Sequence, residues 1–251
     1  MKEIKDNFSK QSDTYRKFRP NYPQELYDLL LNLVVQTERC WDCGTGNGQV
    51  AAELAQYFDE VYASDISQNQ IQNAIQKENI SYYVTRVEET DFPDDAFDLI
   101  TVGQALHWFD LEAFEKEVRR VSRSGAILGA WGYGLLTVDP VIDTVIEDFY
   151  LNKVGPYWDQ ERDHIDSAYQ TVRFDFEEID VTPQFTIEEE RTLNQLEGFF
   201  RSWSSVQHYL AKHPGEDPVD PLMEKIKDVW GKAEIRKMIY PVFIRIWRVQ
   251  K

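Results

Sequence analysis

The chain of 251 residues is long enough to bury one substantial core, and its 42% hydrophobic content suits a single globular domain. Its 44 acidic and 27 basic residues give a formal net charge of −17, which would repel phosphate backbones and anionic lipid surfaces, and no Lys/Arg-rich block offsets it. We therefore expect neither a nucleic acid nor a membrane as a partner.

The N-terminal residues and the cysteines bear on localisation. Residues 1–20 lack the apolar stretch of a secretory signal, and no uncharged apolar run approaches the ~20 residues that a bilayer span requires. Two cysteines are too few for a secreted domain held together by disulfides. We expect a cytoplasmic protein that is a monomer or a dimer.

The first half of the chain predicts helices followed by alternating strands and helices. A helix over 11–18, a break at RPNYP and an amphipathic helix over 24–34 come first, with the prolines as breaks. The strands expected next are ERCWDC, EVYASD, SYYVTRV, FDLITVG and AILGAWG, and the helices between them are QVAAELAQYF, SQNQIQNAIQKE and DLEAFEKEVRRV. This alternation predicts an α/β fold, a Rossmann-like and mostly parallel sheet with helices on both faces.

Beyond about Leu135 the pattern changes to aromatic-rich helices, expected over 141–152, 193–212 and 220–231. The alternating apolar residues of 236–249 predict a closing strand at the edge of the sheet. We accordingly divide a single domain, 1–251, into N-terminal lid helices (1–35), a cofactor-binding core (36–135), a helical cap that forms the substrate region (136–232) and the closing strand (233–251).

The stretch CWDCGTGNGQV places three glycines at alternate positions after the first expected strand. Gly44, Gly46 and Gly48 stand where this strand gives way to a helix, and a turn without Cβ atoms lets a ligand approach the backbone. The nicotinamide and flavin fingerprint G-x-G-x-x-G would require glycine where Gln49 stands. The spacing therefore weakens the dinucleotide interpretation.

Two acids flank this turn. Asp42 stands near the end of the first expected strand, and Asp65 ends the second, about 20 residues after Gly44, which suits an acid that accepts hydrogen bonds from both hydroxyls of a ribose. An adenosyl ligand without phosphates needs acids for its ribose and ammonium groups but no anion-binding nest of glycines. The pattern favours such a ligand.

With these features the chain resembles the class I S-adenosylmethionine-dependent methyltransferases of the type 11 group. EETDFPDDAFDLITVGQALHWFD resembles the family's segment from the third-strand loop to the end of the fourth strand. The pattern Y...RP.YP, RSWSSVQHY and the terminal YPVFIRIWRV are similar to the trans-aconitate-type small-molecule methyltransferases. The resemblance spans nearly the whole chain.

The resemblance implies a seven-stranded sheet with an antiparallel last strand, S-adenosyl-L-methionine as cofactor, and methyl transfer to a small-molecule acceptor, at oxygen and conceivably at a carboxylate. It implies that the glycines lie along the methionine half of the cofactor, that Asp42 orients the loop and the amino group, and that Asp65 binds the ribose. The cofactor-binding residues implied are Asp42, Gly44, Gly46, Gly48, Asp65, Ile66, Val87, Glu88, Gln104, Arg19 and Tyr15. The sequence departs from the family pattern at Arg86, where many members have an aspartate that accepts from the adenine amine, and at RSGA, which lacks the family's proline.

His107 is the catalytic candidate, because a neutral imidazole suits deprotonation of an alcohol or amine near pH 7. The alternative is that it shapes the pocket wall, since a carboxylate acceptor requires no proton removal. The expected acceptor-binding residues are Trp108, Trp131, Trp203 and Arg201. In so acidic a protein an anionic acceptor would need arginine clamps, and Arg19, Arg173 and Arg201 are the candidates.

Other interpretations remain beside this one. Cys40 and Cys43 form a C-x-x-C pair, but a structural zinc site needs four ligands and a redox pair normally opens a helix, so we expect buried small side chains and no metal. A regulatory protein that binds the cofactor without transferring the methyl group is one alternative function. An NAD(P)-binding oxidoreductase is another.

Overall fold

The computed structural model describes residues 20–251, so the helix expected over 11–18 and the candidate residues Tyr15 and Arg19 lie outside the described residues. The strands are β1 (Arg39–Cys43), β2 (Glu60–Asp65), β3 (Ile80–Val84), β4 (Phe97–Gly103), β5 (Ser122–Tyr133), β6 (Glu177–Ile179), β7 (Phe185–Thr192) and β8 (Ile235–Arg248). The α-helices are α2 (Gln24–Leu31), α3 (Gln49–Leu54), α4 (Gln68–Gln72), α5 (Leu111–Val121), α6 (Pro140–Asp148), α7 (Arg162–Asp166), α8 (Leu193–Arg201), α9 (Ser204–Lys212) and α10 (Val219–Trp230). Short helices of other types are η1 (Leu106–Trp108), η2 (Phe149–Lys153) and η3 (Gly155–Tyr157).

The strands form one eight-stranded sheet with the order β3-β2-β1-β4-β5-β8-β6, and β7 pairs with β8 off this path. Strands β1 to β5 are mutually parallel. Strand β8 runs antiparallel to β5, and β6 and β7 run antiparallel to β8. The Rossmann-like mixed sheet with an antiparallel closing strand is confirmed.

The sheet has eight strands, whereas the resemblance implied seven and the sequence located six; the other two, β6 and β7, arise in a region for which only helices were expected. Along β7, Phe185 and Ile187 are buried while Thr186 and Glu188 are exposed, which is the alternation of a strand with one buried face. The run IEEER conceals this alternation in the sequence, because several consecutive acids are typical of a solvated surface. Both strands pair with β8, which is 14 residues long. Residues 242–248 of β8 pair with β5, and its first residues extend beyond β5 to pair with β7.

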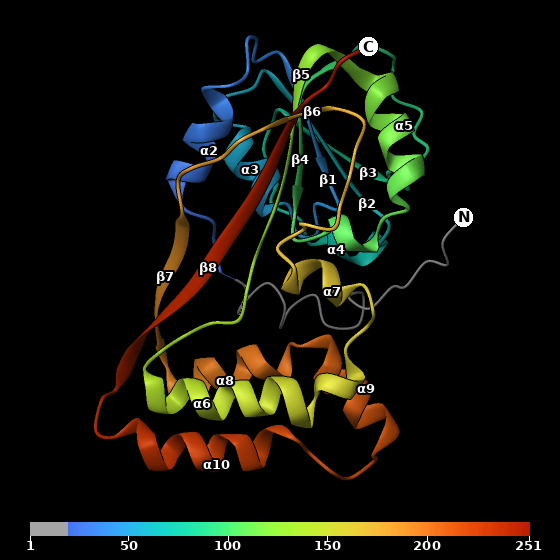
Figure 1. Cartoon of the computed structure of the whole chain (residues 1–251). Helices are drawn as coiled ribbons and strands as arrows, with labels where there is room; N and C mark the ends of the chain where they lie inside the picture. Colours follow the sequence, from blue (N-terminus) through green and yellow to red (C-terminus); the bar gives the residue numbers. More distant parts are fainter. Residues whose placement is uncertain (1–19) are drawn as a thin grey trace.

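Helices cover both faces of the sheet, with α2 and α3 on one side and α5 on the other (Figure 1). Helix α5 begins at Asp110, whose carboxylate caps the amide of Ala113. Its buried residues Phe114, Val118 and Val121 recur at helical spacing and pack on the sheet. On the opposite face, apolar residues of α2 and α3 pack with residues of the late helices in one continuous core.

Helices α6, α8, α9 and α10, here called the helical layer, lie beyond the carboxyl ends of the parallel strands, where β7 and β8 lead away from the sheet (Figure 1). The single helix expected over 193–212 is two helices, α8 and α9. The break falls at Ser202, whose hydroxyl donates to the carbonyl of Phe199, and at Trp203, which is extended. This conformation packs the Trp203 ring edge-on against Phe200, at 5.1 Å between centroids.

Within residues 20–251, no helix combines the length and apolar character that a membrane crossing demands.

A buried carboxylate ties the amino ends of three strands together. Asp98 on β4 is 6% exposed, and one of its oxygens accepts from the backbone amides of Glu38 and Arg39, at 3.1 and 3.0 Å. The other oxygen accepts from Arg123 on β5 at 2.8 Å. Removal of this carboxylate would leave the two backbone amides without their acceptor and would leave Arg123 paired, among the described acids, with Glu38 alone.

We predict that Asp98→Ala lowers the free energy of unfolding by about 2–4 kcal/mol, because two backbone amides lose their acceptor and Arg123 loses one of its carboxylate partners. Urea unfolding measures the change. The control, Asp175→Ala, removes a side chain that is 98% exposed and should change the free energy of unfolding by less than about 0.5 kcal/mol. Equal effects of the two substitutions would contradict the prediction.

Candidate active site

The glycine turn connects β1 to α3 in a backbone conformation that favours glycine. Gly44, Gly46 and Gly48 have φ angles of +65°, +56° and +79°. A Cβ at Gly44 would lie 2.6 Å from the Cβ of Ala105, and one at Gly48 would lie 2.3 Å from the hydroxyl of Tyr82. A Cβ at Gly46 would meet no atom within 4 Å. The outer glycines therefore pack against the protein, and the middle one faces open space.

Asp42 braces this turn from beneath. Its carboxylate is 1% exposed and accepts from the hydroxyl of Thr45 in the turn at 2.5 Å and from that of Thr101 on β4 at 2.9 Å. Burial raises the pKa of Asp42 to about 7, although these two hydrogen bonds oppose the shift. Asp42 thus joins the turn to the neighbouring strand from a position inside the core.

Asp65, at the end of β2, contacts the turn directly. One carboxylate oxygen accepts from the backbone amide of Gly46 at 2.9 Å, and the other accepts from the amide of Ser67 at 2.8 Å. The parallel pairing of β1 with β2 produces this contact, because it brings the carboxyl ends of both strands to one edge of the sheet. The two features that the sequence singled out, the glycines and the second acid, are therefore neighbours.

Three further candidates surround the start of α5 and the end of β2. Ile66 is 43% exposed, and Val87 is buried. Glu88 accepts from the backbone amide of Asp110 at 3.0 Å and pairs with Arg86 at 3.2 Å. Arg86, the departure from the family pattern, is thus engaged by an acid of its own loop.

Two pockets open at the carboxyl ends of the strands. The glycine pocket encloses about 440 Å³ with its solvent-open part and is lined by Pro20, Tyr22, Gly44, Thr45, Gly46, Asn47, Gln49, Val50, Gly103, Gln104 and Tyr133. The aromatic pocket encloses about 660 Å³ on the same measure and is lined by Gln104, His107, Trp108, Tyr133, Gly134, Leu135, Leu136, Trp158, Asp159, Arg162, Phe199, Trp203 and Ser204. Gln104 and Tyr133 line both pockets, so the pockets adjoin there.

Gln104 is held firmly at this junction. Its φ angle of +55° is unusual for a residue with a side chain. The backbone amide of Gln104 donates to the carbonyl of Trp131 at 2.8 Å. Its side-chain oxygen accepts from the backbone amide of Tyr133 at 2.8 Å. Strand β5 therefore determines where the Gln104 side chain lies.

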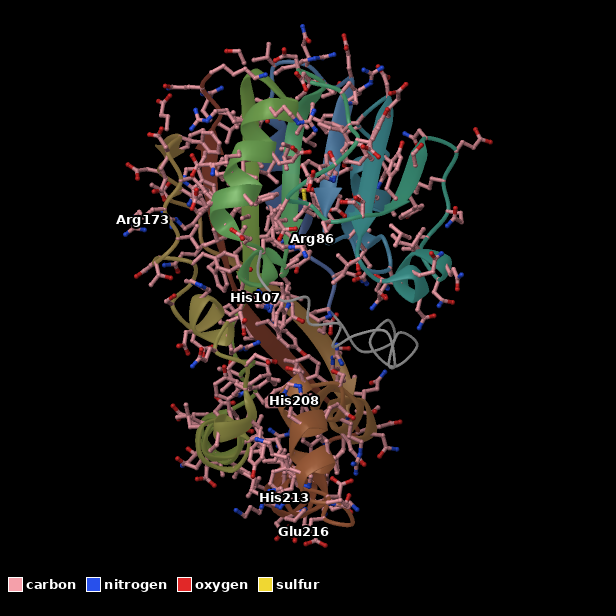
Figure 2. All side chains as sticks on the ribbon, turned by 90° about the vertical axis from the view of Figure 1, so that its right-hand side faces the viewer. Arg86, His107, Arg173, His208, His213 and Glu216 are labelled. Carbon is pink, nitrogen blue, oxygen red and sulfur yellow. The ribbon has the colours of Figure 1, made fainter. Side chains whose placement is uncertain are left out.

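The structure brings together His107, Trp108 and Trp203 in the aromatic pocket. His107 lies between the sheet and the helical layer (Figure 2), is 7% exposed, and its Nδ1 is 3.3 Å from the hydroxyl of the buried Tyr169. This contact orients the imidazole. The three residues come from η1 and from the start of α9, which lie far apart in sequence.

Trp131 and Arg201, the other expected acceptor-binding residues, line neither pocket. Trp131 is fully buried and packs edge-on against Tyr22, with 5.6 Å between ring centroids. Arg201 pairs with three acids of the helical layer, Glu197, Asp217 and Asp220. Arg173, which is exposed, donates to backbone carbonyls at the outer side of the molecule (Figure 2).

The aromatic pocket also contains two charged residues that no sequence signal had marked, Asp159 and Arg162. They follow Trp158 in the stretch WDQER, a composition that equally suits a solvated helix surface. The one signal that could have indicated Arg162 is its spacing of four residues from Trp158, which allows an arginine to stack on an aromatic ring.

No group of three or more His, Cys, Asp or Glu residues that could hold a metal ion occurs within residues 20–251. Cys40 and Cys43 are buried in β1, and burial raises the pKa of both thiols well above the usual value.

Comparisons with known proteins identify the family. Residues 41–129 match the family model described as a methyltransferase domain. A Dictyostelium discoideum protein named as a methyltransferase is 31% identical over 247 residues, which cover 95% of this chain and 93% of that protein. The chain belongs to the class I S-adenosylmethionine-dependent methyltransferases.

Solved structures agree with this assignment. A structure from Anaeromyxobacter dehalogenans, described as a type II methyltransferase, is 35% identical to this methyltransferase, with a TM-score of 0.85 over 93% of this chain and 99% of that one. The YcgJ protein of Bacillus subtilis is 15% identical with a TM-score of 0.52 over 91% of this chain and 99% of that one, a likeness of fold alone.

The raised pKa of Asp42 predicts a pH-dependent stability of the methyltransferase. An aspartate whose pKa is higher in the folded state than in the unfolded one stabilises the fold fully below about pH 4, and this contribution is lost as the pH rises through about 7. We predict that Asp42→Asn, which cannot ionise, removes this loss, so that the difference in unfolding free energy between variant and wild type grows by roughly 1–4 kcal/mol from pH 4.5 to pH 8.

Urea unfolding at a series of pH values measures this difference, with the exposed Asp175→Asn as control. Parallel stability curves for wild type and Asp42→Asn would show that Asp42 does not titrate in this range.

Proposed function

We propose that this methyltransferase transfers the methyl group of S-adenosyl-L-methionine to an oxygen of a small molecule, and that this oxygen belongs to a carboxylate. The observation that carries the proposal is the junction of the two pockets at Gln104 and Tyr133. A cofactor in the glycine pocket and an acceptor in the aromatic pocket would meet at that junction.

The glycine pocket suits the methionine half of the cofactor, and the residues that we assign to the ribose and adenine lie outside its lining. The open space in front of Gly46 admits the methionine half, while Asp65, beside the same backbone, binds the ribose hydroxyls. We assign Ile66, Val87 and Glu88 to the adenine. We assign Asp42 an indirect role, in which it positions the turn that contacts the cofactor, because its carboxylate is 1% exposed and bonded to the hydroxyls of Thr45 and Thr101.

Bound S-adenosylmethionine supplies a methyl group on a cationic sulfur. An acceptor oxygen held at the junction would form a bond to the methyl carbon, while the carbon–sulfur bond would break and leave its electron pair on sulfur. A carboxylate acceptor has no proton to lose, so the protein has to align the acceptor and exclude water. Since charge is neutralised between an anionic acceptor and the sulfur, a dry aromatic pocket favours the transition state over the separated charges.

Two observations support a small-molecule acceptor. The aromatic pocket has the size of ordinary metabolite sites, and the net charge of −17 opposes nucleic acids and membrane surfaces. The stretches RSWSSVQHY and YPVFIRIWRV resemble the trans-aconitate-type methyltransferases.

Two measurements test the proposal as a whole. S-adenosylhomocysteine should raise the melting temperature while NAD and NADP leave it unchanged, since a ligand of the native state stabilises it. Labelled methyl groups should pass from S-adenosylmethionine to low-molecular-weight products of a metabolite extract. Stabilisation by S-adenosylhomocysteine without any labelled product would instead favour a regulatory protein.

We predict that Asp65→Ala raises the dissociation constant of S-adenosylhomocysteine roughly 10- to 100-fold, because charge-assisted hydrogen bonds to two hydroxyls are lost. Calorimetry measures this constant. Asp59→Ala removes an exposed acid near the opposite end of the same strand and should leave the constant unchanged. Unaltered binding by Asp65→Ala would refute the ribose assignment.

His107→Gln distinguishes the two kinds of oxygen acceptor. For a carboxylate acceptor we predict a fall in kcat of less than about tenfold with the pH profile unchanged, since His107 then only shapes the pocket. A fall of 100-fold or more with loss of a titration near pH 6–7 would identify a hydroxyl acceptor and make His107 the base. His164→Gln on α7, outside both pockets, is the control.

A further inference from the structure

The aromatic pocket contains a positively charged side chain, Arg162, that has no role in the methyl-transfer step described above. Arg162 begins α7 and lines the pocket beside Asp159. Its side chain is only 18% exposed, although the guanidinium is a group that proteins rarely bury without partners. The contacts of this guanidinium therefore decide its role.

Those contacts hold the guanidinium in place without using its outer nitrogens. The central carbon lies 4.7 Å above the ring of Trp158 and 5.5 Å from that of Tyr150. The Nε atom donates to the hydroxyl of Tyr150 at 2.9 Å and lies 3.4 Å from Asp166. Within residues 20–251, neither Nη1 nor Nη2 has a hydrogen-bond partner.

The support behind Arg162 is itself fixed. The Tyr150 hydroxyl donates to Asp166 at 2.6 Å, so that a closed set of contacts joins Tyr150, Asp166 and the Nε edge of Arg162. A guanidinium ordered in this way loses little conformational freedom when it binds a ligand. Its two terminal nitrogens match the geometry of a carboxylate.

We propose that Arg162 determines acceptor specificity by binding a carboxylate of the methyl acceptor with its two terminal nitrogens. The acceptor then carries two distinct features, an anionic group held by Arg162 and a second oxygen that reaches the junction at Gln104 and receives the methyl group. The aromatic rings of the pocket contact the apolar part between them. This inference rests on the proposed function and extends it to the class of substrate.

The pocket also contains an acid, and an acid among aromatic rings could hold a cationic amine instead. The carboxylate of Asp159 lies 3.8 Å from Nδ1 of His208, and this nitrogen is also 3.0 Å from the carbonyl of Tyr157. Arg162 adds a positive charge to the same pocket and would oppose a cation. The observations therefore favour an anionic acceptor, and a cationic one becomes an outcome of the test.

The first experiment separates a deproteinised metabolite extract into anionic, neutral and cationic fractions before labelled S-adenosylmethionine and enzyme are added. We expect label in products of the anionic fraction with the wild type and with Arg39→Met, which removes an exposed arginine at the start of β1. Arg162→Met should lower this incorporation at least tenfold. Label from the cationic or neutral fraction would overturn the inference while leaving methyl transfer intact.

The second experiment does not depend on turnover. Protein saturated with S-adenosylhomocysteine is titrated with a series of C3–C10 mono- and dicarboxylates and with their uncharged amides, and tryptophan fluorescence reports binding. Wild type and Arg39→Met should bind at least one acid about 10- to 100-fold more tightly than its amide, and Arg162→Met should bind both equally weakly. Equal affinities for acid and amide in the wild type, or no saturable binding of any acid, would overturn the inference.

Two controls separate recognition from folding. The dissociation constant of S-adenosylhomocysteine should be the same for wild type and Arg162→Met, which shows that the glycine pocket is intact. Should Arg162→Met melt early, Arg162→Lys serves in its place, since it keeps the charge but not the paired donors and should bind the acid with intermediate affinity. If S-adenosylhomocysteine itself fails to bind the wild type, the proposed function fails rather than this inference alone.

Discussion

The hydrogen bond from the Gly46 amide to the Asp65 carboxylate is the constraint on which the site depends. It joins the ends of two parallel strands across a turn in which Gly46 faces open space. Beneath it, Asp42 carries its charge at a position fully withdrawn from water, at a cost in stability that its raised pKa expresses. The hydrogen bonds of the same carboxylate oppose this cost, and they hold the turn through Thr45 and join it to β4 through Thr101.

This half of the site could be predicted because its information is local. Alternation of strands and helices predicts a parallel sheet, and in the observed order β3-β2-β1-β4-β5 the ends of β1 and β2 are neighbours. The glycines at 44, 46 and 48 are required by the backbone, and their spacing is visible in the sequence. Element boundaries were less predictable, as α4 shows, since its helix covers only Gln68–Gln72 of the twelve-residue stretch expected.

The acceptor half could not be predicted in the same way. Its residues come from η1, the end of β5, the segment before α7 and the α8–α9 break, and only long-range packing assembles them. Trp131 illustrates the difficulty, because an apolar ring can serve the core or a pocket, and its place in the sequence does not distinguish the two. Arg201 shows the same difficulty for a charged residue, since two of its three acids, Asp217 and Asp220, lie on the loop before α10 and on α10 itself.

The geometry of β8 links the two halves. Its second part pairs with β5 inside the sheet, and its first part pairs with β7 beyond it, so that one continuous strand carries the helical layer over the glycine turn (Figure 1). Among residues 20–251, only Gln104 and Tyr133 belong to both pockets. Substitutions elsewhere in the aromatic pocket can therefore alter which acceptor binds without disturbing the turn. Under the proposed function, binding of the methyl donor would depend on backbone and parallel strands, whereas acceptor choice would depend on side chains such as Arg162 that the helical layer and its connections present.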